Sequence, residues 1–244
     1  MIIPTWQVSK RIKHFVSTRQ GGVSQPPFES FNLALHVEDD VSSVLENRRI
    51  LQSILAIEQT PLWLDQRHTT NMVEWNGEAL ESLPIADAAW TSKPNTPVCV
   101  MTADCQPLLV TNKKETFVAA IHVGWQGLLD GIITKSILAL PDKPENMTVL
   151  IGPSISQANF EVEADFVAKF VAKNSDNHAF FKRQSDIKYK ADLVGISCLE
   201  LQALGVNKIT KSQRCTFENK TSFFSYRREG KTGRMVTVIW LDEN

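Results

Sequence analysis

The sequence has 244 residues, of which 43% are hydrophobic and 22% charged, so it can bury the core of one large domain. Its 26 basic and 27 acidic residues give a formal net charge of −1. This balance argues against a general binder of nucleic acid or of membrane surfaces, because both need a strongly basic face. We therefore expect a small-molecule partner, no nucleic acid and no membrane.

The N-terminal residues lack an apolar segment of signal-peptide length, and no stretch approaches the roughly 18 to 20 apolar residues that cross a bilayer. The chain has four cysteines and is long enough to fold without disulfides. We predict a cytoplasmic protein with reduced thiols, present as a monomer or a weak homo-oligomer.

A turn and a helix are the first predicted elements along the chain. Residues 19–27 contain two glycines and two prolines, which favour turns. A helix is predicted to start near Asp40, because Ser43 followed three residues later by Glu46 fits a capping box.

Strands and helices alternate over the rest of the chain. Apolar runs typical of buried strands occupy residues 97–101, 108–110, 117–121, 149–151 and 235–241. Helical spacing of apolar residues follows Gly127 and recurs over 163–173 and 192–204. The sequence thus predicts an α/β (α+β) fold with a central sheet, in a single domain spanning residues 1–244.

Three residues, His68, Cys105 and His122, are the candidate site residues. Each lies in a loop or at the end of a predicted strand, where sites in sheet proteins are usually built. Two imidazole nitrogens and a thiolate suit zinc, and three protein ligands leave a fourth position for water or substrate.

The spacing of these residues leaves other interpretations open, because the chain has no CxxC or HExxH signature. Cys105 can be an inert buried thiol, with each histidine an ordinary loop residue. Alternatively, Cys105 can act as a nucleophile without metal, with His122 or His68 as its base. Sequence order does not separate these possibilities.

The other histidines are weaker candidates. His14 follows a basic cluster and His178 lies in a polar stretch, so both are expected at the surface. His36 either lines a pocket or has a structural role.

Two pairs of adjacent arginines are candidates for binding an anion, Arg48 with Arg49 and Arg227 with Arg228. Adjacent side chains point in different directions, so at most one of each pair should face a common pocket. The planar guanidinium suits phosphate or carboxylate, although most arginines are solvated surface charges.

Several motifs occur together, in a fixed order, over nearly the whole chain. They are STRQGGVS (17–24), FNL (31–33), VEDD (37–40), ENRRIL (46–51), QRH (66–68), ADA (86–88), TADCQP (102–107), IHVGWQG (121–127), IGPSI (151–155), RCT (214–216), FSYRREG (224–230) and TGR (232–234). In this set and order the sequence resembles the laccase-domain family, also called YfiH-like or polyphenol-oxidase-like.

The resemblance implies a layered α/β/β/α fold and a zinc ion held by His68, Cys105 and His122, which would also be the catalytic residues. It further implies purine nucleoside phosphorylase activity on adenosine, guanosine, inosine and methylthioadenosine, together with adenosine deaminase activity. An older interpretation of the family is copper-dependent oxidation of phenols. Four cysteines and five histidines do not readily supply a multicopper cluster, so copper is the less favoured metal.

The implied chemistry needs a place for phosphate beside the ribose. Arg48 is the first candidate for binding phosphate or substrate, and Arg19 is the second. Asn32 offers both a donor and an acceptor to the ribose or the base. For deamination, zinc with an open position would activate water, and Asp104, next to Cys105, is a candidate for moving protons.

Five positions depart from the family's usual pattern. Arg67 and Thr69 flank the first histidine, where Val and Gly are usual, and Gln126 replaces an arginine. In a later helix, Val194 and Ser197 stand where Trp and Asn are usual. The missing arginine at position 126 removes an anion contact, for which Arg67 offers a substitute.

These departures leave two functions of other classes open. The pairing of cysteine with histidine also suits a cysteine or metal hydrolase acting on amide bonds, for example of a cell-wall precursor. A binding or regulatory protein on an enzyme-like scaffold is the third hypothesis.

Overall fold

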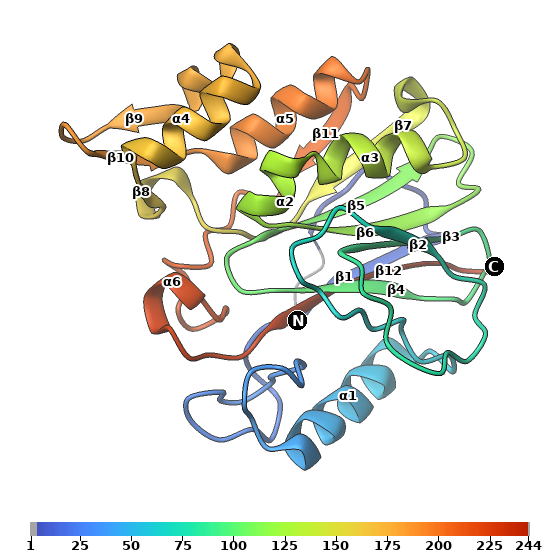
Figure 1. The fold of residues 1–244 in the computed structure, drawn as a ribbon. Helices are drawn as coiled ribbons and strands as arrows, with labels where there is room; N and C mark the ends of the chain where they lie inside the picture. The colour runs from blue at the N-terminus through green and yellow to red at the C-terminus, as the bar shows by residue number, and fades with distance from the viewer. Residues whose placement is uncertain (1–3, 244) are drawn as a thin grey trace.

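The computed structural model describes residues 4–243 and shows four stacked layers (Figure 1). Helix α1 (Val41–Leu55) forms one outer layer. Next to it lies a three-stranded sheet in the order β1-β12-β4, followed by a six-stranded sheet in the order β11-β7-β5-β6-β3-β2. The other outer layer consists of the helices α2 (Trp125–Asp130), α3 (Ile132–Ala139), α4 (Ala164–Lys173) and α5 (Leu193–Ala203).

The small sheet is antiparallel and joins both ends of the chain. Its strands are β1 (Ile12–Val16), β12 (Met235–Leu241) and β4 (Val98–Thr102). The strands of the large sheet are β11 (Lys208–Lys211), β7 (Met147–Ile151), β5 (Gln106–Asn112), β6 (Val118–Val123), β3 (Ala88–Thr91) and β2 (Met72–Glu74). A third sheet beside α4 has the order β8-β10-β9, with β8 (Glu161–Glu163), β10 (Lys188–Ala191) and β9 (Phe181–Arg183).

The layers are held together by strands that are apolar on both faces. In β6, Ile121 packs toward the helices, whereas Ala120 packs into the core between the two sheets. In β4, Val100 joins the same inter-sheet core, whereas Cys99 and Met101 pack on the side of α1. Because successive side chains of a strand alternate between faces, each central strand contributes to two cores at once.

The predicted mixed α/β, layered, single-domain fold is confirmed, as are the five predicted strands. Two details of the helices differ from prediction. The helix expected after Gly127 is two helices, because Gly131 has a φ of 88° and separates α2 from α3. Helix α1 is capped by Asp40, whose Oδ2 accepts from the backbone N of Ser43, so Ser43 is not the cap. The single central sheet expected is instead three sheets.

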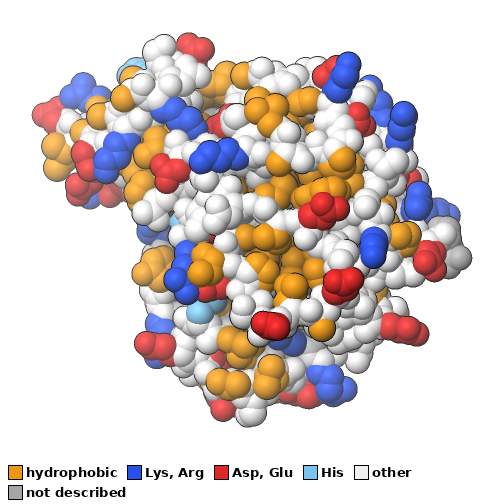
Figure 2. All heavy atoms as spheres, turned by 45° about the vertical axis from the view of Figure 1, so that its right-hand side comes forward, with side chains coloured by type: hydrophobic (Ala, Val, Ile, Leu, Met, Phe, Trp, Pro, Cys, Tyr) orange, Lys and Arg blue, Asp and Glu red, His pale blue; other side chains and the backbone are white. Residues whose placement is uncertain are grey.

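The surface shown in Figure 2 carries Lys and Arg interspersed with Asp and Glu. This mixture agrees with the formal net charge of −1. Among the described residues, no helix is long and apolar enough to cross a membrane.

Candidate active site and metal centre

The three candidate ligands come from separate segments that meet where the chain passes between the two stacked sheets. Cys105 lies in the short connection from β4 in the small sheet to β5 in the large sheet. His122 is near the end of β6, between Ile121 and Val123, which both face the helices. Alternation therefore directs the His122 side chain to the opposite face, toward the small sheet. His68 lies in the connection that precedes β2.

The structure brings these three side chains into one cluster. Their potential ligand atoms all lie within 4.8 Å of one another. The Sγ of Cys105 is 3.9 Å from the Nε2 of His68, and the rings of His68 and His122 have centroids 4.9 Å apart. Residues separated by as many as 54 positions in the chain thus converge at one point.

Gly124 makes this approach possible. A Cβ atom at this position would lie 2.8 Å from the Nε2 of His68 and 3.3 Å from the Sγ of Cys105, and it would overlap the Cδ2 of His68. His68 itself adopts a left-handed conformation with a φ of 58°. Such a conformation is unfavourable for most residues and recurs at functional sites.

The fully buried carboxylate of Asp87 holds His122 and the segment around His68 in place. Its Oδ1 lies 2.7 Å from the Nδ1 of His122 and accepts from the backbone N of His68 at 3.1 Å. Its Oδ2 accepts from both the backbone N and the hydroxyl of Thr69. Because Nδ1 of His122 is engaged by Asp87, Nε2 is the nitrogen left to face a metal.

The charges of the cluster depend on its mutual contacts. Burial alone would raise the pKa of the Cys105 thiol, but His122 and His68 outweigh it and lower that pKa. Burial alone would lower the pKa of His122, but Cys105 and Asp87 raise it. Without metal, the site therefore favours a thiolate beside an imidazolium, and a divalent cation would take the place of the proton.

The donor set fits zinc. Two imidazole nitrogens and one thiolate sulfur are borderline to soft donors, and three protein ligands are typical of a catalytic zinc site. The buried carboxylate on His122 supplies the outer support that such ligands usually have.

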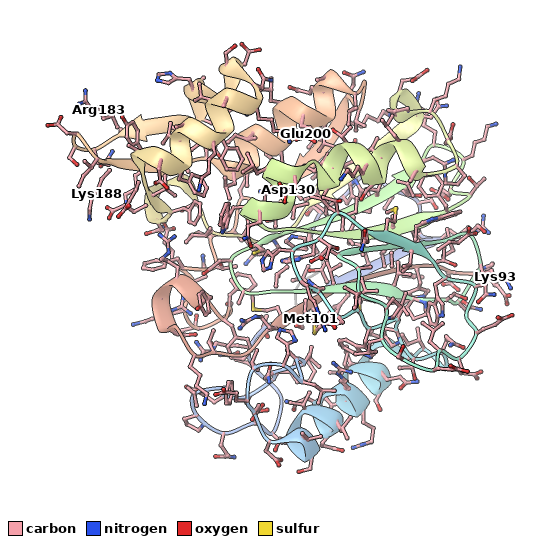
Figure 3. The ribbon with its side chains drawn as sticks, viewed as in Figure 1. Lys93, Met101, Asp130, Arg183, Lys188 and Glu200 are labelled. Atoms are coloured by element: carbon pink, nitrogen blue, oxygen red, sulfur yellow. The ribbon has the colours of Figure 1, made fainter. Side chains whose placement is uncertain are left out.

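A cavity of about 790 Å³ opens beside the three ligands. Met101, labelled in Figure 3 at the end of β4, is one of its lining residues. Three aromatic rings lie in its wall, those of Trp125 from α2, Phe166 from α4 and Phe160 next to β8. Phe166 packs on both Trp125 and Phe160, at centroid distances of 5.3 and 5.9 Å. This wall is suited to a flat, apolar ring.

Two arginines, Arg227 and Arg234, also line the cavity. Arg227 lies in α6 (Tyr226–Glu229), and its guanidinium stacks on Phe160 at 4.6 Å and donates to the backbone O of Glu161. Arg234 donates to the backbone O atoms of Thr232 and Gly233, and burial lowers its pKa. Neither guanidinium forms an ion pair with a carboxylate of residues 4–243, so both can bind an anion.

The three residues predicted to bind substrate, Arg19, Asn32 and Arg48, are outside the lining of this cavity. Arg19 pairs with Glu229 at 2.6 Å, and the guanidinium of Arg48 stacks on Trp63 at 3.7 Å. Fully buried Asn32 accepts from the backbone N of Arg234 at 2.9 Å. Arg19 and Arg48 therefore have structural partners, and Asn32 supports Arg234, a residue of the cavity.

The structure also shows the surroundings of three positions that depart from the family's pattern. Gln126 lines the cavity, so the arginine that usually stands there would have faced it. Arg67 instead pairs with Asp65 at 2.6 Å outside the cavity lining and does not substitute for it. Thr69 adds a hydroxyl donor to Asp87 that a glycine would lack.

The remaining histidines follow the sequence analysis in part. His178 is exposed, whereas His14 is half-buried and contacts the backbone O of Pro4 at 2.9 Å. His36 lines the cavity, and burial and Arg234 lower its pKa. The adjacent arginines behave as predicted, since Arg227 faces the cavity and Arg228 donates to the backbone O of Phe217.

Sequence reasoning gave no role to Asp87 or Arg234. Both residues lie within motifs of the resemblance, ADA and TGR, so a signal was present. Their roles depend on contacts across 35 and 202 positions of the chain, which spacing does not reveal.

A family model described as "Multi-copper polyphenol oxidoreductase laccase" matches residues 13–242. A purine nucleoside phosphorylase of Haemophilus influenzae is 41% identical, over 99% of each chain. The purine nucleoside phosphorylase YfiH of Escherichia coli (strain K12) is 39% identical, over 99% of this chain and 98% of that protein.

Solved structures share the whole fold. Neisseria meningitidis protein NMB0706 matches with a TM-score of 0.93 at 37% identity, covering 98% of each chain. The Bacillus licheniformis hypothetical protein YfiH matches with a TM-score of 0.89 at 27% identity, covering 95% of this chain and 93% of that one.

Proposed function

Because this chain belongs to the multi-copper polyphenol oxidoreductase laccase family, the YfiH-like proteins, we propose that it is a zinc-dependent purine nucleoside phosphorylase. One observation carries the proposal. His68, Cys105 and His122 converge beside a cavity that has an aromatic wall and two arginines without carboxylate partners among residues 4–243. A nucleoside and a phosphate are the ligands that such a cavity suits together.

The aromatic wall would hold the purine. Phe160, Phe166 and Trp125 offer rings on which a base can stack, and stacking tolerates different purines. This tolerance agrees with adenosine, guanosine, inosine and methylthioadenosine as substrates.

Phosphate would bind at Arg227 and Arg234. Phosphorolysis needs phosphate fixed beside the anomeric carbon of the ribose, and a guanidinium presents paired N–H donors to such an anion. Asn32 would act through the backbone of Arg234, and Arg48 and Arg19 through the packing of α1 and of the segment around α6.

Zinc would be held by His68, Cys105 and His122, and it would supply a Lewis acid at the inner end of the cavity. We favour zinc over copper because a multicopper cluster needs more imidazoles than three ligands supply. Of the five histidines, His14 lies in β1 and His178 is exposed on the outer helical layer. The same zinc would support deamination of adenosine as a second activity.

The test is a panel of the four nucleosides, with and without phosphate, followed by identification of the products. Release of free base that requires phosphate establishes phosphorolysis, and formation of inosine from adenosine establishes deamination. Cys105→Ala should lower turnover by about 10²-fold or more, because it removes a ligand and leaves two histidines. Cys198→Ala, on α5 outside the cavity lining, is the matched control. Full activity of Cys105→Ala would refute the proposal.

A hydrolase of amide bonds is the second candidate, favoured by the thiolate that His122 and His68 stabilise at Cys105. In that case, thiol alkylation would abolish amide cleavage in protein stripped of metal. Phosphate-independent cleavage of an amide substrate, without release of purine base, would distinguish it from the lead.

A further inference from the structure

Asp104, the neighbour of Cys105, binds a distant part of the chain. Its Oδ1 accepts from the hydroxyl of Thr216 at 2.6 Å. Its Oδ2 accepts from the hydroxyl of Ser225 at 2.9 Å and from the backbone N of Arg227 at 2.7 Å. These donors lie 112 to 123 positions away along the chain. Asp104 thus joins the connection that carries Cys105 to the segment that carries Arg227.

The backbone at Asp104 is shaped for this role. Its φ is 95°, in the left-handed region that favours glycine, and its backbone O accepts from Ile155 at 3.0 Å. A non-glycine residue persists in such a conformation when its surroundings over-determine it. Three hydrogen bonds to the carboxylate provide that constraint.

The same contacts engage both carboxylate oxygens of Asp104 with groups of the protein. This arrangement favours a positioning role for Asp104 over the proton transfer considered for it from the sequence. The contact that matters for the reaction is the one to Arg227, since α6 has four residues and cannot hold its own position. Asp104 fixes the backbone of Arg227, while Phe160 and Glu161 hold its guanidinium.

We propose that Asp104 is a positioning residue that fixes Arg227 beside the metal site and thereby builds the phosphate subsite. The phosphate part of this inference rests on the proposed function, whereas the tie between Asp104 and Arg227 does not. The connection between β4 and β5 would then serve both binding sites, because Cys105 in it would bind the metal and the adjacent Asp104 would position Arg227 for phosphate.

The test compares Asp104→Ala with Asp104→Asn. The alanine removes all three acceptor contacts, so the KM for phosphate should rise about 10-fold or more, with kcat changing less and bound zinc retained. The asparagine oxygen can keep Ser225 and Arg227, and its NH₂ can donate to the hydroxyl of Thr216, so its KM for phosphate should stay within about threefold. A proton-transfer role would make both variants equally damaging and remove one limb of the pH profile.

Two further variants keep the test decisive. If Asp104→Ala does not fold, Thr216→Val takes its place in the test. It removes one of the three donors to Asp104 without changing the connection that carries Cys105, and it should raise the KM for phosphate. Asp142→Ala is the matched control, because Asp142 also accepts from three groups, Asn112, Asn146 and Lys143, in a turn away from the cavity. It should leave the KM for phosphate unchanged.

Amide hydrogen exchange supplies a readout that needs no activity. In Asp104→Ala, the amide of Arg227 should exchange about 10-fold faster or more, whereas in Asp104→Asn it should stay protected. Unchanged exchange in Asp104→Ala overturns the inference, and so does an unchanged KM for phosphate in an active enzyme. If the wild-type protein releases no base with phosphate, the proposed function fails, and the exchange measurement still decides the role of Asp104.

Discussion

Gly124 determines how closely His68 and Cys105 can approach each other. Its φ is −78°, a value that any residue adopts, so its glycine is not required by the backbone. The requirement is steric, because a Cβ would meet both ligands. The hydrogen atom that glycine has in place of a Cβ thus leaves room for the His68 ring and the Cys105 Sγ to lie close together.

Gly124→Ala should lower zinc affinity by about 10- to 100-fold, the range observed when the surroundings of metal ligands are disturbed. The added methyl group must displace the ring of His68 or the Sγ of Cys105, and neither can move far without losing the shared centre. Titration with zinc in the presence of a competing chelator measures the change.

Gly127→Ala provides the comparison from the same stretch of chain. Its Cβ would come no closer than 3.3 Å to the Cγ2 of Ile132, a side chain that can shift slightly. Zinc affinity near that of the wild type is expected for Gly127→Ala. Equal losses in the two variants would show that α2, rather than the ligands, responds to the added methyl group.

At this scale the sequence identified three potential metal ligands that the fold brings together, but not the residues around them. His68, Cys105 and His122 carry donor atoms whose chemistry can be recognised in a sequence. Arg48 and Arg234 are chemically the same, and their difference lies in the surroundings that the fold creates. Arg48 is stacked on Trp63, whereas Arg234 faces the cavity.

Among the secondary-structure elements, strands were easier to predict than the ends of helices. The runs at β4 and β12 are apolar at nearly every position because both faces of each strand are buried. The capping box at Ser43 and Glu46 predicted the start of α1 to within a few residues, but the carboxylate of Asp40 is the group that caps the backbone N of Ser43. The break between α2 and α3 was not predicted, because the apolar residues keep helical spacing through Gly131 although the backbone there is left-handed.

Helix α6 shows how a short element is held by side chains. Glu229 at its end accepts from Arg19, Arg228 and Thr232, and Arg19 also stacks on Phe224 at 4.7 Å. Burial alone would raise the pKa of Glu229, but the hydrogen bonds from Thr232, Arg19 and Arg228 outweigh it and hold that pKa below its ordinary value. The helix that carries Arg227 is thereby tied to the N-terminal segment.

Glu229→Gln should reduce the free energy of unfolding by about 1–2 kcal/mol at pH 7, since partial exposure screens the charge-assisted hydrogen bonds that it weakens. The lowered pKa fixes the sign of the pH dependence. The stabilising effect is fully present above the pKa of an unfolded glutamate and is lost as the pH falls through the folded value. Urea unfolding of both proteins at pH 7 and near pH 4 measures the difference.

The two curves should converge at the acid end. A difference that stays constant with pH would mean that packing, rather than the charge of Glu229, stabilises α6. Glu81→Gln, which changes an exposed carboxylate, should leave the free energy of unfolding nearly unchanged at both pH values.

Across the whole molecule, the site depends on the stacking of two sheets. Cys105 lies where the chain leaves the small sheet, His122 belongs to the large sheet, and His68 precedes the strand at the edge of that sheet. The layered architecture was predicted through the resemblance, since hydrophobic patterns show that strands are buried without showing what covers them. A metal bound by all three residues would therefore connect separate layers.

Removal of the proposed zinc ion should consequently destabilise the whole fold and not the site alone. A ligand that binds the folded state at 100 times its dissociation constant stabilises it by about 2.7 kcal/mol, which corresponds to about 5 to 10 °C in Tm for a chain of this size. Protein treated with a chelator should melt lower by this amount, and added zinc should restore the original Tm. Thermal unfolding followed by circular dichroism measures both steps.

Cys105→Ala and Cys198→Ala separate this effect from zinc binding elsewhere. The first lacks a ligand that joins the two sheets, so its Tm should hardly respond to chelator or to zinc. The second retains His68, Cys105 and His122 and should respond as the wild type does, because Cys198 lies on α5 outside the cavity lining. A zinc-dependent rise in Tm that persists in Cys105→Ala would place the stabilising metal at another site and break the link between metal binding and the stacking of the sheets.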